Sequence, residues 1–414
     1  MKKASLILLL LLVFILEGCS FYNASPVNDE DNIKSTAVLS LGRDKLQELP
    51  VYNKLLSEQL QIDLRSYDLT SLDIGNRYED LIHADFDTNT KWPYNLPEGF
   101  NPKQIMEYGK NPGLKIEDLH DQNINGAGVN IAIIGDALLQ NHSEYKGQLK
   151  LYENIHCLDK KSTESGCAAA SIAVGETTGI APQAKLYYVA NTAGKYEGDK
   201  FIADLTWLAS AIDKVIEINN GLPKNKKIRV LSIGAEISKE DKGYDSLLKT
   251  ANKAKDSGIF VVSSMIYDMY TSYDVNRIEF EYQGLGRLPM SEPDELTSYV
   301  PGIQWANSFY SFTRNTRAIE TLLVPADSRC TASPTGVKDY AFYTIGRNNV
   351  SSAYIAGLYA LACQVKPNIT PQIFWRAALE TGDVTKIKSS YINYTYTLRR
   401  IVNPTKLFES LKAK

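Results

Sequence analysis

The sequence predicts an α/β fold, with a doubly wound, mostly parallel sheet and helices on both faces. Short apolar segments rich in β-branched residues alternate with longer segments of helical period. The apolar segments are continuous rather than alternating with polar residues, which is typical of strands covered on both faces. In addition, the nearly uncharged run 346–365 has the composition of a helix buried on all sides. Together these observations favour layers of helices around a parallel sheet.

The regular elements follow one another from about residue 116. We expect strands over 129–134, 185–190, 228–233 and 259–262, and helices over 117–120, 204–218, 244–256, 346–365, 371–379 and 404–411. Thr370 and Pro371 have the residue types preferred at the start of a helix. The tyrosine-rich stretch 265–317 predicts irregular loops. These loops would either form a binding surface or pack down on their own aromatic rings.

The first residues predict export from the cytoplasm. Lys2 and Lys3 precede the apolar run 6–16, which is short for a membrane-spanning helix and has the order of a secretory signal. The segment 16–19 resembles the cleavage box of a bacterial lipoprotein signal, which implies a signal peptide over 1–18 and a lipid on Cys19. Ordinary signal cleavage and an uncleaved anchor are the alternatives.

The distribution of polar and apolar residues predicts how the rest of the chain is divided into segments. Residues 19–40 are rich in Asn, Asp, Ser and Pro and are expected to form a lipidated, solvated tether. Residues 41–115 predict a loop-rich N-terminal extension, either a small subdomain or a strap across the main domain, and 116–414 predict that domain. We expect the folded part at the cell envelope, lipid-anchored on the extracytoplasmic side of the membrane, or secreted.

The composition restricts the partners. The 414 residues are 44% hydrophobic and 22% charged, with a net charge of −3, so a strongly basic face for nucleic acid is not expected. No His or Cys pair has zinc-ligand spacing, and no glycine-rich phosphate loop follows a strand. We therefore expect neither a metal nor a cofactor.

Four cysteines remain besides Cys19, namely Cys157, Cys167, Cys330 and Cys363. Their number is even, and an exported chain can form disulfides. Cys157 and Cys167 could close a small disulfide loop, or they could be two separately buried thiols. Cys363 lies on the predicted buried helix and is expected to be a core residue.

Three segments resemble the subtilisin-like serine peptidases. They are 126–134 followed by His142, 166–172 followed by 179–186, and 354–357 with the helix beyond it. They occur in the family's order between about residue 116 and the C-terminus. The resemblance implies the family's fold and substrate groove, and a reaction in which a serine attacks, a histidine takes its proton and an aspartate orients that histidine.

The positions that match this triad carry other residues. The aspartate position is Gly135, the histidine position is Ser165 and the serine position is Asn349. The segment 263–267 offers no amide side chain to stabilise an oxyanion. By resemblance the chain belongs with serine-type endopeptidases, yet it is expected to be inactive, with no catalytic residue at these positions.

A displaced triad of Asp136, His156 and Ser351 or Ser352 is the alternative. A shift of one residue at the end of a strand predicts that Asp136 points to the opposite face of the sheet. Ser351 and Ser352 lie further along the helix than the position of the nucleophile. His142 is expected to be a loop histidine rather than a base.

The sequence therefore leaves three functional hypotheses. The favoured one is a catalytically inactive lipoprotein that binds an extended peptide or a protein partner through the retained groove, with the membrane reached through its lipid. The second is an active serine-type endopeptidase with the displaced triad. The third is a purely structural lipoprotein with a filled groove.

Overall fold

The computed structural model describes residues 38–56, 60–159, 161–198, 200–270, 280–311, 321–388 and 394–413. The expected signal peptide, Cys19 and most of the expected tether lie outside these residues. Within the described ranges, no helix is both long enough and apolar enough to cross a membrane.

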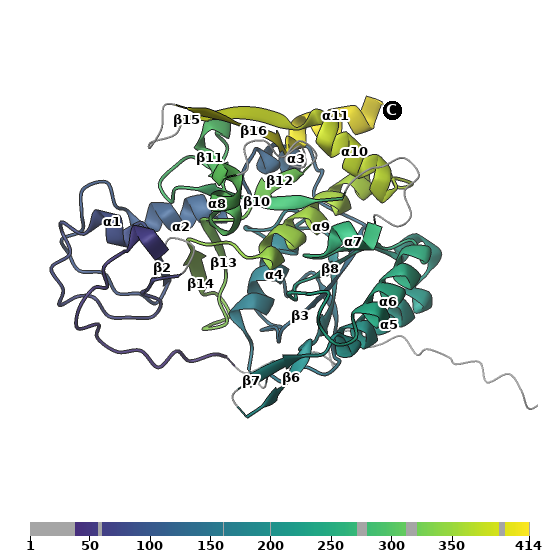
Figure 1. Ribbon diagram of the computed structural model, residues 1–414, viewed down its shortest axis with the longest axis horizontal. Coiled ribbons are helices and arrows are strands. Elements are labelled where there is room, and N and C mark those ends of the chain that lie inside the picture. Colours follow the sequence, from purple (N-terminus) through teal and green to yellow (C-terminus); the bar gives the residue numbers. More distant parts are fainter. Residues whose placement is uncertain are drawn as a thin grey trace, which may run out of the picture. The chain divides into compact units, whose positions relative to one another are not determined.

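The centre of the fold is a five-stranded sheet in which every neighbouring pair of strands is parallel (Figure 1). The strand order is β4 (Leu149–Asn154), β5 (Lys185–Ala190), β3 (Asn130–Gly135), β8 (Ile228–Ile233) and β9 (Phe260–Val262). The apolar segments at 129–134, 185–190, 228–233 and 259–262 form four of these strands. The predicted α/β class, with a doubly wound and mostly parallel sheet, is confirmed.

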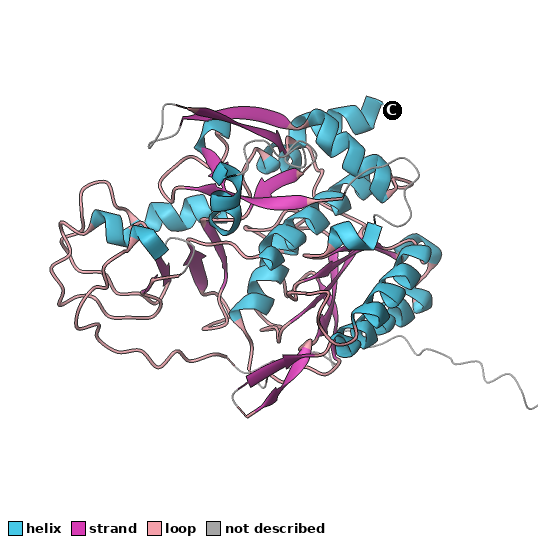
Figure 2. Cartoon of the chain, viewed as in Figure 1, coloured by secondary structure: helices cyan, strands magenta, loops and turns pink. Residues whose placement is uncertain are grey.

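Helices cover this sheet on both faces, as Figure 2 shows. The helices next to the central sheet are α4 (Glu164–Val174), α5 (Leu205–Gly221), α6 (Tyr244–Asp256) and α9 (Asn348–Val365). Helix α9 contacts α4, β8 of the central sheet and β12 (Leu322–Pro325) of a second sheet. Nearly all of its side chains are buried, from Val350 to Cys363. The predicted central helix is therefore present and lies between two sheets.

The expectation of irregular loops over 265–317 is wrong for the described part of that stretch. It contains α7 (Ile266–Tyr270), β10 (Tyr282–Arg287), η3 (Leu296–Ser298), β11 (Tyr299–Pro301) and α8 (Ile303–Ser311). Strand β10 joins the second sheet, in the order β11-β10-β12-β16-β15, with β15 (Asp383–Lys388) and β16 (Thr395–Ile401). A Cβ at Gly284 would lie 2.6 Å from the Ala326 Cβ, so the close approach of these strands requires glycine. Glycine weakens the sequence signal of a strand.

The N-terminal extension shares a sheet with the main domain. The order of this third sheet is β1 (Ile62–Asp63), β2 (Ala84–Asp87), β14 (Tyr340–Tyr343) and β13 (Arg329–Ala332). A separate hydrophobic cluster around Phe86, Phe100 and Ile105 also includes Cys330 and Phe342 from the far end of the chain. The extension is thus joined to β14 of the rest of the fold through its own strand β2.

The remaining elements complete the description. They are η1 (Lys54–Leu56), α1 (Tyr78–Leu81), α2 (Pro102–Lys110), α3 (Ile116–Asp121), the hairpin of β6 (Gly194–Glu197) and β7 (Lys200–Ala203), η2 (Lys224–Lys226), α10 (Pro371–Thr381) and α11 (Pro404–Ala413). The helices predicted near 117–120, 371–379 and 404–411 correspond to α3, α10 and α11.

Candidate functional site

A pocket of about 1010 Å³ opens at the carboxyl ends of neighbouring strands of the central sheet. Gly135 ends β3, Asn191 follows β5 and Gly234 follows β8, and all three line the pocket. Ser165 in the first turn of α4 and Asn349 in the first turn of α9 line it as well. The carboxyl edge of a doubly wound sheet is where loops converge and ligands bind.

Local contacts fix where the two helices begin. The Thr163 hydroxyl caps α4 by accepting a hydrogen bond from the Gly166 amide, at 3.1 Å. The Thr163 amide donates to the carbonyl oxygen of Ala137, at 2.8 Å, and so ties α4 to the loop that follows β3. Just before α9, a Cβ at Gly346 would lie 2.1 Å from the Ala326 carbonyl oxygen, so only glycine fits there.

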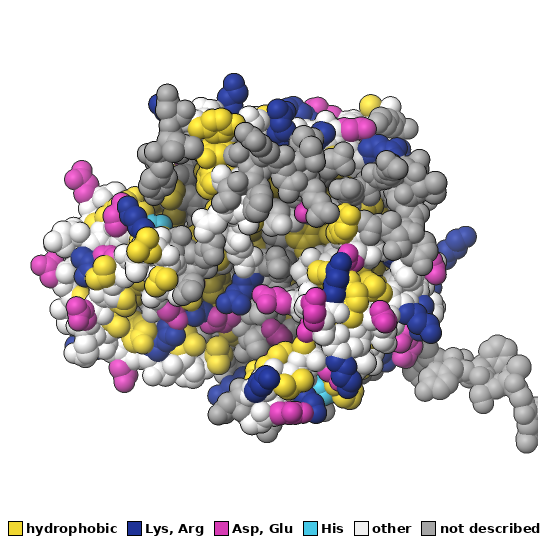
Figure 3. Space-filling view, viewed as in Figure 1, with side chains coloured by type: hydrophobic (Ala, Val, Ile, Leu, Met, Phe, Trp, Pro, Cys, Tyr) yellow, Lys and Arg dark blue, Asp and Glu magenta, His cyan; other side chains and the backbone are white. Residues whose placement is uncertain are grey.

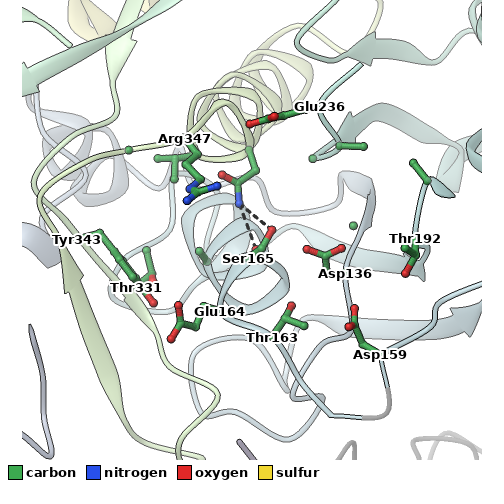
Figure 4. Close-up of a pocket in the computed structure, with 18 of the residues that line it drawn as sticks. Asp136, Asp159, Thr163, Glu164, Ser165, Thr192, Glu236, Thr331, Tyr343 and Arg347 are labelled. Carbon is green, nitrogen blue, oxygen red and sulfur yellow. Dashed lines mark hydrogen bonds between the residues drawn. The ribbon is translucent and has the colours of Figure 1, made fainter. Parts of the chain in front are cut away.

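The three positions that match the peptidase triad therefore meet in one pocket. The Asn349 Nδ2 donates to both the hydroxyl and the carbonyl oxygen of Ser165, each at 3.3 Å (Figure 4). An amide side chain is not a nucleophile, and a serine hydroxyl is a poor base at neutral pH. These groups form a hydrogen-bonded pair, not a nucleophile and its base.

Asp136 faces the pocket, contrary to the prediction from strand alternation. Its carboxylate lies beside the Ser165 hydroxyl, which slightly lowers the pKa of Asp136, and Figure 4 shows the two side chains side by side. The prediction is wrong because β3 ends at Gly135, so Asp136 lies beyond the ladder and alternation no longer fixes its direction. The Tyr188 hydroxyl holds this turn by donating to the Asp136 carbonyl oxygen, at 2.6 Å.

The pocket carries negative charge on the side of Asp136. Burial raises the pKa of the Asp136 carboxyl, and repulsion from Asp159 raises it further. Burial likewise raises the pKa of Asp159. Both shifts mean that the folded protein holds these carboxylates in a less favourable setting than water does.

The structure does not assemble the alternative triad of Asp136, His156 and Ser351 or Ser352. The His156 ring stacks on Trp207 with 3.7 Å between ring centroids, and its Nε2 lies 3.0 Å from the Gly194 carbonyl oxygen. The Ser352 hydroxyl is buried against Ser232, at 3.1 Å, and donates to a carbonyl of its own helix.

No histidine lines the pocket, although all four in the chain are among the described residues. His142, expected in a loop, is buried with its Nε2 2.9 Å from the Asp339 carbonyl oxygen. Ser263, which follows β9, is also buried away from the pocket and contacts Met269. The pocket therefore offers hydrogen-bonding groups and charge, but no base of the type that activates a serine.

The N-terminal extension supplies part of the wall, which sequence reasoning missed. Arg65 forms an ion pair with Glu164 at the start of α4 and a second one with Asp63, at 2.8 Å. Asp85 is buried, which raises its pKa to about 6, and it accepts hydrogen bonds from the amide and hydroxyl of Thr344, each at 2.8 Å. No local pattern around these residues distinguishes them from other charges of the extension.

Cys157 and Cys167 do not form the suggested disulfide; the four described cysteines are free thiols. Cys167 is fully buried within α4, where burial raises its pKa to about 11. Cys157 is only half-buried, in the segment after β4. The alternative of two separate thiols therefore holds, although only Cys167 is fully buried.

No family model matches the chain. One similar solved structure is the prenylagaramide maturation protease PagA, which is 16% identical, with 72% of this chain and 99% of that chain covered and a TM-score of 0.47. Another is the PatG macrocyclase in complex with a peptide, which is 15% identical, with 72% of this chain and 95% of that chain covered and a TM-score of 0.45. At this level of similarity neither structure determines the activity of this chain, and the α/β fold class rests on its own strand order.

We expect Asp136→Asn to stabilise the protein at about pH 8, raising the unfolding midpoint by roughly 1–3 °C. The pKa of Asp136 is higher in the folded protein than in the unfolded chain. The free energy of unfolding is therefore largest at low pH and falls as the pH rises through the folded-state pKa, because the carboxylate must then be charged in a buried site. Asparagine has nearly the same size and shape as aspartate but carries no charge. Thermal unfolding at several pH values checks this, and the difference from wild type should shrink toward about pH 4.

The matched control is Asp213→Asn, which removes an exposed carboxylate paired with Lys253 at 3.2 Å. It should change the midpoint little, because exposed pairs contribute little. A lower midpoint for Asp136→Asn at about pH 8 would contradict the raised pKa of Asp136.

Proposed function

We propose that this chain is a catalytically inactive, subtilisin-like protein of the cell envelope that binds an extended peptide or protein segment in the pocket described above. One observation carries the proposal. The residues at the three triad positions meet in that pocket, where the Asn349 amide bonds to Ser165 instead of a serine bonding to a histidine. The scaffold brings these positions together without the groups that cleave a peptide bond.

The shape and lining of the pocket support a peptide as the ligand. The hairpin of β6 and β7 forms one side of the opening, and its Tyr196 and Phe201 line the pocket while 63% and 44% exposed. A two-stranded hairpin has edges with backbone groups that an extended segment can pair with. Strand addition of this kind needs no catalytic side chain.

The proposed location depends on the first nineteen residues alone. Lys2, Lys3, the apolar run 6–16 and Cys19 support export and a lipid anchor, so that the pocket would face the extracytoplasmic side of the membrane. An exported protein without the lipid would present the same pocket in secreted form.

We expect the full chain in detergent micelles to remain unlabelled by a fluorophosphonate probe and to hydrolyse casein only at the background rate. The physical reason is the absence of a histidine beside any serine of the pocket. Peptides captured from a random library should elute with unchanged mass. Intact-mass spectrometry reports both results, and a probe adduct on any serine of this chain would overturn the proposal.

We expect hydrolysis to appear after two substitutions, Ser165→His and Asn349→Ser, with Gly135 left in place. Asp136 already faces position 165 and would orient the new histidine, whereas a Cβ at Gly135 would lie 2.9 Å from the Tyr188 hydroxyl. Without an oxyanion amide side chain, the rate should lie roughly 10²–10³ below that of a complete site. Ester hydrolysis and fluorophosphonate labelling of the introduced serine measure the effect.

Two controls accompany this experiment. Asn349→Ser alone lacks a base, and Ser165→His with Asn349→Ala lacks a nucleophile, so neither variant should be labelled. Adding Gly135→Asp to the double variant should lower the yield of folded protein rather than raise the rate. No labelling of a well-folded double variant would show that the three positions do not form the geometry of a peptidase site.

A further inference from the structure

We propose that the pocket binds the cationic side chain of a lysine or arginine in the bound segment, and that Asp136, Asp159 and Asn191 form its acceptor cluster. This inference rests on the proposed function, because it names the chemistry of the peptide that the pocket receives. It also makes the acidic side of the pocket a determinant of specificity.

The acceptor cluster comes from three neighbouring strands. Asp136 follows β3, Asp159 lies in the segment after β4, and Asn191 follows β5, in a sheet whose order is β4-β5-β3. All three line the pocket. Figure 4 shows the side chains of Asp136 and Asp159 next to each other, with Thr192 beside them. Asp136 and Asp159 are close enough for the charge of Asp159 to raise the pKa of Asp136, and Asn191 lines the same pocket.

Asn191 indicates independently that a donor is missing. Its side chain is only 4% exposed, and its Nδ2 donates to the carbonyl oxygens of Ile155, at 2.6 Å, and Trp207, at 3.1 Å. These two bonds fix the amide and leave its Oδ1 as the free end, buried and without a hydrogen-bond partner. A buried acceptor without a partner is costly, and a donor on the ligand would remove that cost.

No ion pair of the described residues neutralises the two carboxylates, although Arg347 lines the same pocket. No ion pair reaches Asp136 or Asp159 within these ranges, and Arg65 of the pocket wall is engaged by Asp63 and Glu164. Buried Arg329, which also lines the pocket, donates to the backbone carbonyls of Pro112 and Thr178. Two partly buried carboxylates without an ion-pair partner attract a positively charged ligand.

A side chain fits this site better than a metal ion. Among the described residues, no group of three or more His, Cys, Asp or Glu is arranged to hold a metal. An ammonium or guanidinium instead donates several hydrogen bonds at once, to carboxylates and to an amide oxygen alike. Asn191 and the two carboxylates supply acceptors of both kinds.

The rim of the pocket suits the aliphatic stem of such a side chain. Leu158, Tyr196 and Phe201 line the pocket and remain 41%, 63% and 44% exposed. The Tyr196 and Phe201 rings meet edge to face, with 5.4 Å between their centroids. Figure 3 shows acidic side chains gathered beside the apolar surface of this hairpin. Lysine and arginine bury their stems on apolar surfaces while their charged ends reach polar groups.

The test compares four pools of acetylated, amidated nonapeptides with random Ala, Ser, Gly and Tyr positions around a central Lys, Arg, norleucine or Glu. Binding to the full chain in detergent micelles is measured by fluorescence anisotropy. We expect the Lys and Arg pools to bind about tenfold or more tightly than the norleucine pool. In the double variant Asp136→Asn with Asp159→Asn, the preference for the Lys and Arg pools over the norleucine pool should fall to about twofold or less. The variant Asp159→Lys should bind the Glu pool more tightly than the norleucine pool.

The matched control is Asp213→Asn, which removes the same charge from an exposed position of α5 and should keep the full ratio. Equal binding of the Lys and norleucine pools would overturn this inference while leaving peptide binding intact. A ratio that survives in the folded double variant would overturn it too. If no pool binds, the proposed function fails and this inference fails with it.

Discussion

The packing of α9 between two sheets determines where every group of the site lies. This helix contacts α4, β8 and β12, and a Cβ at its Gly357 would lie 2.5 Å from the Ile180 Cβ. Such close approach fixes the helix along its axis, and the turn at Gly346 fixes its first residue. Asn349 is thereby held against Ser165 at the start of α4, and both lie above the end of β3.

This arrangement separates the architecture of the site from its chemistry. The helices begin at the same pocket whatever their first side chains are, since caps and glycine contacts set those starts. The side chains then determine what the pocket does. An amide, a hydroxyl and a carboxylate side by side, as in Asn349, Ser165 and Asp136, can bind a polar ligand but include no histidine to take the proton of a nucleophile. The same scaffold can therefore hold a site that binds a ligand without reacting with it.

Much of the fold could be predicted because its strands are buried on both faces and read as continuous apolar runs. Strand β10 is not evident from the sequence, because Gly284 and Gly286 replace the usual β-branched residues where other residues approach closely. The direction of Asp136 was predicted wrongly, because alternation applies within a ladder and stops where β3 ends. Arg65 could not be predicted at the pocket, because its place depends on the pairing of β2 with β14, two strands from opposite ends of the chain.

The gathering of the three substituted positions in one pocket could be predicted from motif order. The acceptor cluster could not, because Asp159 and Asn191 belong to no motif and meet Asp136 only through the order of β4, β5 and β3. The same topology explains why the hairpin of β6 and β7, with its exposed Tyr196 and Phe201, stands beside the carboxylates: it directly follows β5 in the chain. Apolar contact, strand edges and negative charge are thus combined at one opening.

Peptide binding by an inert pocket is tested most directly by hydrogen–deuterium exchange of the full chain, with and without a saturating concentration of the Lys-centred peptide pool. We expect slower exchange in β6 (Gly194–Glu197), in β7 (Lys200–Ala203) and at the end of β3, with the peptides recovered uncleaved. Protection confined to other surfaces, or cleaved peptides in the same samples, would contradict it.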